Sequence, residues 1–420
     1  MRMSPHAPDG QVDLDSVDLF DPFLHSEGHP HAVWRALRAQ APVHRQQLPD
    51  GRQFWSVTRY ADACRVLRDH EDFTSERGTL LSALDVGDPA GGKMMAASDP
   101  PHHTMLRESL NRVLSARAVN ARRNTLLGPV DRLVEPLLTG EPTDLAVLAA
   151  DFPMDFIGTF MGLPESDWPR LTKLTTMAVA PHDPAFQEGS APLTLVTAHH
   201  ELFEYFSEQL AARDGTPTDD LIGHLMRTRI DGKPLDHESI VYNCYSLILG
   251  ANVTTPHTVT GLVQALMDHP DAYHAVVADP SLAAGCVEEG LRWTSPASHF
   301  MRYATQDVRL SGRTVKAGSA LAVWLGSANR DEDVFADPYT FDVKRRPNRH
   351  IAFGFGPHYC VGAALARLSL RMLLERVCAL VERIEPAGEV RHLASNFVAG
   401  ITSMPVRGVP RDGAHPTRLS

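Results

Sequence analysis

The chain has 420 residues with a formal net charge of −11, and 43% of them are hydrophobic, which is ordinary for a globular protein. The acidic balance argues against a general nucleic-acid binder. The five cysteines are sparse and have no paired spacing, so we expect a reducing cytoplasm and no disulfide framework. No apolar run approaches the about 20 residues that cross a bilayer, so we expect no membrane segment.

The chain is expected to form one domain. Length alone suggests two or three domains, but no linker-like stretch divides the sequence. We predict a single domain over residues 1–420, with loose tails rich in Pro, Gly and charge at 1–17 and 409–420. The first predicted elements are a helix over residues 30–41, strands over 42–46 and 53–57, and a second helix over 60–69.

A long irregular segment follows over residues 74–97. A loop of this length inside a compact protein is usually functional, although a flexible solvent loop is the plain alternative. In the next predicted helix, His103 and Arg107 are four residues apart and share one face. Two such groups suit a carboxylate partner, whereas a solvated face is the ordinary alternative. Residues 117–240 predict several helices, broken near Gly140, Pro153, Pro164, Pro184 and Pro217.

The longest predicted helix runs from Asp236 to Asp268 and contains a proline near its centre. Pro256 has no N–H, so the carbonyl group of Asn252 loses its usual helical partner. That carbonyl and the Thr254 hydroxyl could bind water at a local kink, or the proline merely bends the helix. The sequence leaves both alternatives open.

One cysteine lies in a glycine-rich loop, directly before a predicted helix over Ala363–Leu380. The glycines permit a tight backbone, and the helix start places N–H groups and a positive dipole end near the sulfur of Cys360. This field favours a thiolate. A thiolate without a second cysteine is a poor zinc site and a good axial ligand for haem iron, although a buried structural cysteine is the plain alternative.

The Phe-Gly-x-Gly-x-His-x-Cys-x-Gly frame around Cys360 resembles the haem-binding signature of the cytochrome P-450 family, and motifs in the family's order extend from Asp18 to Arg407. The resemblance implies a mainly α (α+β) cytochrome P-450 fold, a helical haem-binding body with a small β-containing lobe. It also implies haem b, iron protoporphyrin IX, with Cys360 as the metal ligand. The residues that match the family's other haem contacts are His103, Arg107, Arg302, His358, Phe353 and Gly354.

The segment around Gly250 resembles the family's helix that crosses the oxygen-binding face of the haem. Thr254 matches the threonine that guides protons to oxygen, and Gly250 belongs to the small pair that leaves room over the iron. Val253 departs from the pattern, because the family usually has a proton-relaying acid there and a valine cannot carry a proton. We therefore take Thr254 and Asn252 as candidate catalytic residues, with Asn252 ordering water in place of the acid.

Glu289 and Arg292 are three residues apart and close enough to form an ion pair. On a surface such a pair contributes little. In the family the matching pair is buried with a third arginine, for which Arg345 is the candidate, and the three lock the loop before the cysteine. The residues expected to face the substrate pocket are Leu84, Val86, Met94, Leu249, Gly250, Val253, Ala297, Ser298, His299, Ile401 and Thr402. For His299, an ordinary hydrogen-bonded role is the alternative.

The resemblance also implies partners, because the chain has no room for a flavin reductase domain. We expect a separate ferredoxin and ferredoxin reductase as electron donors, O2 and a small-molecule substrate, in a soluble, cytoplasmic, bacterial-type enzyme that binds neither nucleic acid nor membrane. The basic segment over residues 344–350, with Arg112, Arg117 and Arg371, would steer an acidic ferredoxin. A solvated charge cluster is the alternative.

The sequence therefore predicts a haem-thiolate monooxygenase that activates O2 and hydroxylates a mid-sized organic substrate in natural-product (secondary metabolite) biosynthesis. Val253 keeps open an enzyme that couples rings or desaturates its substrate without net oxygen insertion. A non-catalytic haem- or ligand-binding protein and a helical protein without haem are the remaining alternatives.

Overall fold

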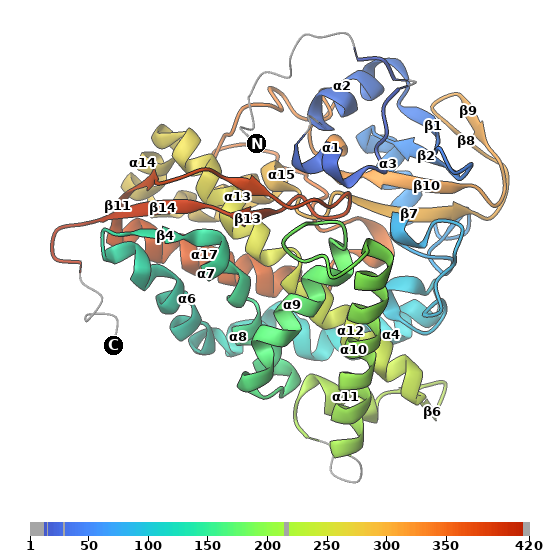
Figure 1. Cartoon of the computed structure of the whole chain (residues 1–420), viewed down its shortest axis with the longest axis horizontal. Coiled ribbons are helices and arrows are strands. Elements are labelled where there is room, and N and C mark those ends of the chain that lie inside the picture. Colours follow the sequence, from blue (N-terminus) through green and yellow to red (C-terminus); the bar gives the residue numbers. More distant parts are fainter. Residues whose placement is uncertain (1–11, 15, 28–29, 214–217, 415–420) are drawn as a thin grey trace.

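The computed structural model describes residues 12–14, 16–27, 30–213 and 218–414. A small β lobe lies at the upper right of Figure 1, and a larger helical body lies below and to its left. This arrangement confirms the predicted α+β fold, a helical body with a β-containing lobe.

The β lobe is built on a five-stranded sheet in the order β1-β2-β10-β7-β3. β1 (Val43–Gln47) and β2 (Gln53–Val57) pair as an antiparallel hairpin, and β10 (Ala320–Trp324) runs parallel to β2. β7 (His299–Ala304) and β3 (Phe73–Thr74) add two antiparallel strands. Both predicted strands are confirmed, the first shifted by one residue.

The helices of the lobe pack their apolar faces on this sheet. They are α1 (Pro22–Ser26), α2 (Pro30–Gln40), α3 (Tyr60–Arg68) and α16 (Leu325–Ala328). α2 buries Val33, Trp34 and Leu37, which are spaced three to four residues apart as one helical face requires. The helix ends two residues before Pro42, because a proline disfavours helical geometry in the residue before it.

Part of the range predicted as a loose N-terminal tail is packed against the protein. Val12, Leu14 and Val17 pack against the core of the β lobe, so this end of the range predicted as a loose tail is held by burial. Residues 1–11 and residue 15 lie outside the described residues.

The helical body contains the remaining α-helices. They are α4 (His102–Leu114), α5 (Ala116–Ala121), α6 (Leu127–Val134), α7 (Leu145–Asp151), α8 (Met154–Met161), α9 (Trp168–Val179), α10 (Ala191–Ala212), α11 (Leu221–Arg227), α12 (His237–Asn252), α13 (Thr255–Asp268), α14 (Pro270–Ala278), α15 (Ala283–Thr294) and α17 (Ala363–Leu380). The predicted breaks near Gly140, Pro153, Pro164 and Pro184 all fall between these helices, and Pro217 lies outside the described residues. No described helix is both long and apolar enough to cross a membrane.

Short 3-10 turns and small sheets complete the chain. The turns are η1 (Leu81–Ala83), η2 (Met95–Ala97), η3 (Arg123–Leu126), η4 (Glu135–Leu138), η5 (Glu165–Asp167), η6 (Pro280–Leu282) and η7 (Gly356–His358). The strands are β4 (Pro142–Asp144), β5 (Arg229–Ile230), β6 (Lys233–Pro234), β8 (Val308–Leu310), β9 (Arg313–Val315), β11 (Val381–Pro386), β12 (Arg391–His392), β13 (Ile401–Ser403) and β14 (Pro405–Pro410). β14 pairs with β11, so Val409 and Pro410 belong to a sheet and not to the expected C-terminal tail.

The predicted helix over 236–268 is two helices. α12 ends at Asn252, α13 begins at Thr255, and the longest described helix is instead α10, with 22 residues. Thr254 between them has φ −121° and ψ −43°, and its Oγ1 donates to the Gly250 carbonyl at 2.9 Å. Pro256 therefore lies in the first turn of a new helix, where its missing N–H does no harm.

Candidate active site

A cavity of about 530 Å³ lies between the β lobe and the helical body. Its wall combines the loop that carries Cys360, the junction of α12 and α13 with Thr254, and the irregular segment after β3. Cys360 keeps exposed surface and lines this cavity. The long loop over residues 74–97 contributes to the wall, so it is not a solvent loop.

The backbone of the cysteine loop is fixed by its glycines and its own hydrogen bonds. Gly354 and Gly356 have φ of +74° and +73°, a region that favours glycine. A Cβ on Gly356 would lie 2.6 Å from the Cα of Arg68, so no side chain fits there. The Cys360 N–H donates to the Phe353 carbonyl at 2.8 Å, which folds the loop back before α17 begins.

The charge of the Cys360 sulfur is set by competing influences. Burial raises the pKa of the thiol, and the opposing influence of the Gly362 and Ala363 amides and of Arg107 and Arg367 is smaller. The amide field expected from the sequence is present, but it does not by itself outweigh burial. A metal cation would, because a coordinating thiol loses its proton outright.

Two imidazoles lie side by side at the same cavity, with the ring centroids of His103 and His358 4.1 Å apart. His103 faces the carbonyl oxygens of Met95 and Pro357, both at 2.9 Å, and His358 faces the Ser75 hydroxyl at 3.1 Å. Burial lowers the pKa of both rings. A neutral imidazole has one N–H, so pairing both carbonyls needs the protonated ring, which a nearby carboxylate would stabilise.

Two guanidinium groups, those of Arg107 and Arg302, also line the cavity. Arg302 is 3% exposed, and burial lowers its pKa to about 10. Burial likewise lowers the pKa of Arg107. Within the described ranges no carboxylate forms an ion pair with either arginine. Arg107 is half-buried, and Arg302 donates to the Met301 carbonyl at 2.8 Å but has no counter-charge there. Desolvated charges without a counter-charge are costly, so this set fits a group that brings its own carboxylates beside a metal, as haem does with its two propionates.

The junction of α12 and α13 supplies open space and a hydroxyl. Leu249, Gly250, Val253 and Thr254 line the cavity. Nothing lies within 4 Å of the position that a Cβ on Gly250 would take. The helix is broken here and not merely bent, and the Thr254 hydroxyl bonds the Gly250 carbonyl in the break.

The expectation that Asn252 faces the reacting centre is wrong. Its side chain is 5% exposed and lies outside the cavity wall. The Asn252 Nδ2 donates toward Met154 Sδ at 3.1 Å and Thr175 Oγ1 at 3.3 Å, on neighbouring helices. Asn252 is the last residue of α12 and Thr254 lies in the break that follows, so the two side chains point in different directions.

Some expected pocket residues line the cavity and others do not. The expected residues that line it are Val86, Met94, Leu249, Gly250, Val253 and Ala297. Those that lie elsewhere are Leu84, Ser298, His299, Ile401 and Thr402. Leu84 is fully buried in the core of the β lobe, Ile401 is in the core of the helical body, and the Thr402 hydroxyl donates to the Arg391 carbonyl at 3.3 Å.

His299 is a structural residue. Side chains alternate along β7, so Phe300 and Arg302 line the cavity while His299 lies on the other face. The Leu81 N–H donates to its Nε2 at 3.1 Å, so the proton sits on Nδ1, which donates to the Asn396 carbonyl at 3.1 Å. The alternative weighed from the sequence, an ordinary hydrogen-bonded histidine, describes this residue.

An aromatic wall of the cavity was not anticipated. It consists of His199 and Phe203 on α10 and Tyr242 and Tyr245 on α12. The Tyr245 hydroxyl lies 3.0 Å from His199 Nε2, and three of the rings meet Phe203 with centroids 5.1 to 5.8 Å apart. Leu195, His199 and Phe203 are spaced four apart, which was a readable signal of one lining face.

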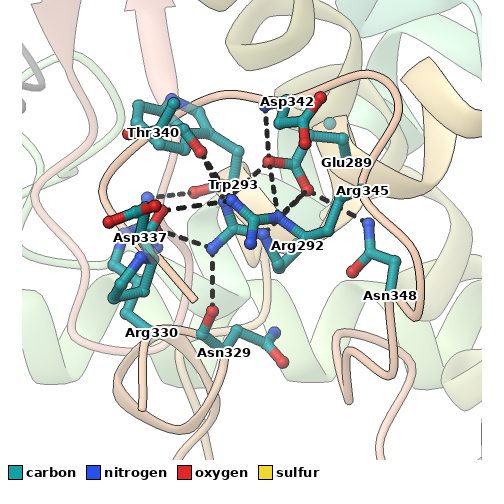
Figure 2. A network of polar contacts seen from close by, with 12 residues as sticks. Glu289, Arg292, Trp293, Asn329, Arg330, Asp337, Thr340, Asp342, Arg345 and Asn348 are labelled. Atoms are coloured by element: carbon teal, nitrogen blue, oxygen red, sulfur yellow. Dashed lines mark hydrogen bonds and ion pairs between the residues drawn. The ribbon is translucent and has the colours of Figure 1, made fainter. Parts of the chain in front are cut away.

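The structure brings Glu289, Arg292 and Arg345 together (Figure 2). The Arg292 guanidinium donates two bonds of 2.8 Å to the Glu289 carboxylate, and the Arg345 Nε lies 3.2 Å from both of its oxygens. Asn348 and the Asp342 amide also donate to Glu289. The network joins α15 to the segment that leads into the cysteine loop.

Comparisons with known proteins agree with this geometry. The protein-family model for cytochrome P450 matches residues 194–379. Cytochrome P450 NovI from Streptomyces niveus is 37% identical over 399 residues, 94% of this chain and 97% of that protein. Cytochrome P450 monooxygenase PikC from Streptomyces venezuelae is 33% identical, over 90% of this chain and 91% of that protein.

The similarity extends to solved structures. The crystal structure of P450 OxyD, which is involved in the biosynthesis of vancomycin-type antibiotics, is 34% identical with a TM-score of 0.83, and the match covers 94% of this chain and 100% of that one. Relatives above 30% identity thus span nearly the whole of both chains. This chain belongs to the cytochrome P450 family and is an oxidoreductase of the monooxygenase type.

Proposed function

We propose that the chain binds haem b through the Cys360 sulfur and hydroxylates a mid-sized organic molecule. The observation that carries this is Cys360 on the wall of a cavity that also holds two imidazoles and two guanidiniums, and no carboxylate of the described residues forms an ion pair with either guanidinium. When bound, the haem supplies O2 activation: two electrons and two protons are consumed, one oxygen atom enters the substrate and the other leaves as water.

The residues of the chain divide this work among them. Arg107, Arg302, His103 and His358 are assigned to the propionates, which would supply the missing negative charge. Thr254 holds a proton at its Oγ1 on the cavity wall, beside the space over Gly250. Val253 is 4% exposed among apolar side chains and excludes water from that wall. Proton delivery therefore depends on the Thr254 hydroxyl and not on a carboxylate at position 253.

A natural-product intermediate is the substrate class that the cavity favours. Most of the wall is apolar, and the aromatic residues of α10 and α12 suit a molecule with planar or ring-shaped parts. The solved relative OxyD is involved in antibiotic biosynthesis, which supports the same class for this chain. Val253 in place of an acid favours a second candidate reaction, oxidative coupling or desaturation without net oxygen insertion.

Electrons are proposed to come from a separate ferredoxin and its reductase. Arg112 on α4, Arg117 on α5 and Arg371 on α17 are exposed, and α5 packs against both α4 and α17. Lys344, Arg346 and Arg349 of the basic segment 344–350 are exposed as well. These charges would attract an acidic partner. Arg345 is not one of them, because it is buried against Glu289. A cytoplasmic location fits the five free cysteines.

The absorption spectrum of the dithionite-reduced, carbon monoxide-treated protein tests the proposal. Wild type and Cys378→Ser, which changes a half-buried cysteine outside the cavity, should show a strongly red-shifted carbonyl band. Cys360→Ser should lose it. A protein without haem, or a carbonyl band like that of a histidine-ligated globin, would contradict the proposal. Product masses then separate the two reactions, since hydroxylation adds one oxygen and coupling or desaturation removes hydrogens.

A further inference from the structure

A second glutamate of α15 makes a network of its own. Glu288 precedes Glu289, and neighbouring helical residues point about 100° apart, so the two carboxylates face different segments. Arg367 of α17 donates to Glu288 through Nε at 2.7 Å and Nη2 at 2.9 Å, a bidentate pair. His350 Nε2 lies 3.0 Å from the same carboxylate. Although burial would raise it, hydrogen bonds from His350 and Arg367 lower the pKa of Glu288 to about 2.

Arg367 also contacts Tyr359 and Phe353, two residues that lie next to Cys360. Its Nη1 donates to the Tyr359 hydroxyl at 2.7 Å. Its guanidinium carbon lies 4.6 Å from the centroid of the Phe353 ring, a cation–π contact. Phe353 in turn accepts the Cys360 N–H through its carbonyl, and Tyr359 is the residue before the cysteine. Arg367 is thus in contact with the residues on which the position of the sulfur depends.

We propose that Glu288 and Arg367 are positioning residues whose opposite charges set the electrostatic potential at the Cys360 sulfur, and thereby the one-electron reduction potential of the haem. The inference rests on the proposed haem-thiolate function and adds a pair that stands apart from the Glu289 network. Arg367 is the nearer member, because it contacts Phe353 and Tyr359, while Glu288 neutralises it from the far side.

The two charges should act in opposite directions. Reduction adds an electron next to the sulfur, so positive charge nearby favours it and negative charge opposes it. Glu288→Gln leaves Arg367 without its counter-charge and should raise the potential. Arg367→Gln removes the positive charge and leaves Glu288 with His350 as its remaining partner, so it should lower the potential. The double variant should return close to wild type, since the net charge of the pair is unchanged.

The test is a spectroelectrochemical titration of the haem-loaded protein with dithionite and redox mediators. Each single variant should change the equilibrium constant for reduction by about threefold or more, about 28 mV at about 59 mV per tenfold. The matched control is Arg376→Gln. Arg376 lies on α17 like Arg367, has a similar exposure, and forms a 2.8 Å pair with Asp131 of α6 that the substitution breaks. This control should leave the potential unchanged. Tyr359→Phe, which keeps both charges, should shift it by less than Arg367→Gln.

Opposite signs distinguish an electrostatic role from a merely structural one. Loss of packing would move both single variants in the same direction and would not be restored in the double variant, and either result overturns the inference. If Arg367→Gln does not fold, Arg367→Lys, which keeps the charge, should hold the wild-type potential, and a shift as large as that of Glu288→Gln would refute it. Failure of the proposed function would be seen earlier, as a wild type without the red-shifted carbonyl band.

Discussion

Replacement of Glu289 by glutamine is the sharpest test of the proximal architecture. Glu289 and Arg292 are both 0% exposed, and Arg345 is 8% exposed. The Glu289 carboxylate is the shared acceptor of both arginines, of Asn348 and of the Asp342 amide (Figure 2). Glutamine keeps the size but replaces one acceptor oxygen by a donor, so two guanidiniums lose their counter-charge at once.

The expected loss in the free energy of unfolding depends on the hydrogen bonds that Arg292 keeps in the variant. Removing one partner of a buried ion pair costs about 3–5 kcal/mol. Arg292 keeps bonds to the carbonyls of Asn329, Pro338 and Thr340, at 2.9, 2.9 and 3.2 Å. These bonds place the Glu289→Gln loss near the lower end, about 3 kcal/mol. That is a large share of the about 5–15 kcal/mol that typically stabilises a protein.

Urea unfolding followed by far-ultraviolet circular dichroism measures the loss. The matched control is Glu201→Gln, which breaks an exposed pair with Arg170 at 2.7 Å and should cost less than about 1 kcal/mol. The haem absorbance should report release of the cofactor at lower urea in Glu289→Gln than in the control. If both variants lose the same small free energy, the buried network does not stabilise the cysteine loop as argued.

The remaining predictions concern the two faces of the cavity and the core of the β lobe. Gly250→Ala should keep or raise the melting temperature, because open space surrounds the added Cβ and alanine favours a helix by about 1 kcal/mol. Gly356→Ala should lower the melting temperature, because its Cβ would lie 2.6 Å from the backbone of α3. Equal effects of the two substitutions would contradict this. Thr254→Ala should raise the hydrogen peroxide released per electron consumed, while Asn252→Leu should not, because only the threonine lines the cavity; the reverse order would restore the role first expected for the asparagine. Burial lowers the pKa of His299 from 6.5 to about 3, so its stabilising contribution is complete above pH 6.5 and is lost as the pH falls toward 3. His299→Gln should therefore lose less stability than wild type between pH 7 and 4.5 in urea unfolding, and an unchanged pH dependence would count against a buried neutral ring.

Features held by short stretches of backbone could be predicted from the sequence. The glycines around Cys360 predict a tight backbone, which Gly354 and Gly356 provide with positive φ angles, and the spacing of Glu289 and Arg292 predicts a shared helix face. The partner arginine, Arg345, came from the family resemblance and not from spacing, because its contact with Glu289 joins segments 56 residues apart. In each case either the local backbone conformation or a family motif restricts which residue can occupy the position.

Side-chain direction at the cavity could not be predicted in the same way. His299 and Arg302 lie on one strand, and only the phase of that strand decides which residue faces the cavity. The direction of the Asn252 side chain was missed for a similar reason, because the end of α12 at this residue and the break at Thr254 decide where each side chain points. The aromatic wall depends on α10 packing against α12, a contact that no single stretch encodes.

The two sides of the site are stabilised in different ways. On the cysteine side, neighbouring carboxylates of α15 serve two networks, Glu289 toward the segment before the loop and Glu288 toward α17. Breaking the first should unfold the loop, while breaking the second should leave the fold and change the potential at the sulfur. On the distal side, Thr254 sits in a helix break with one hydrogen bond to Gly250. The sulfur is thus positioned beside buried charges, whereas the Thr254 hydroxyl is positioned by the local backbone and borders open space at Gly250.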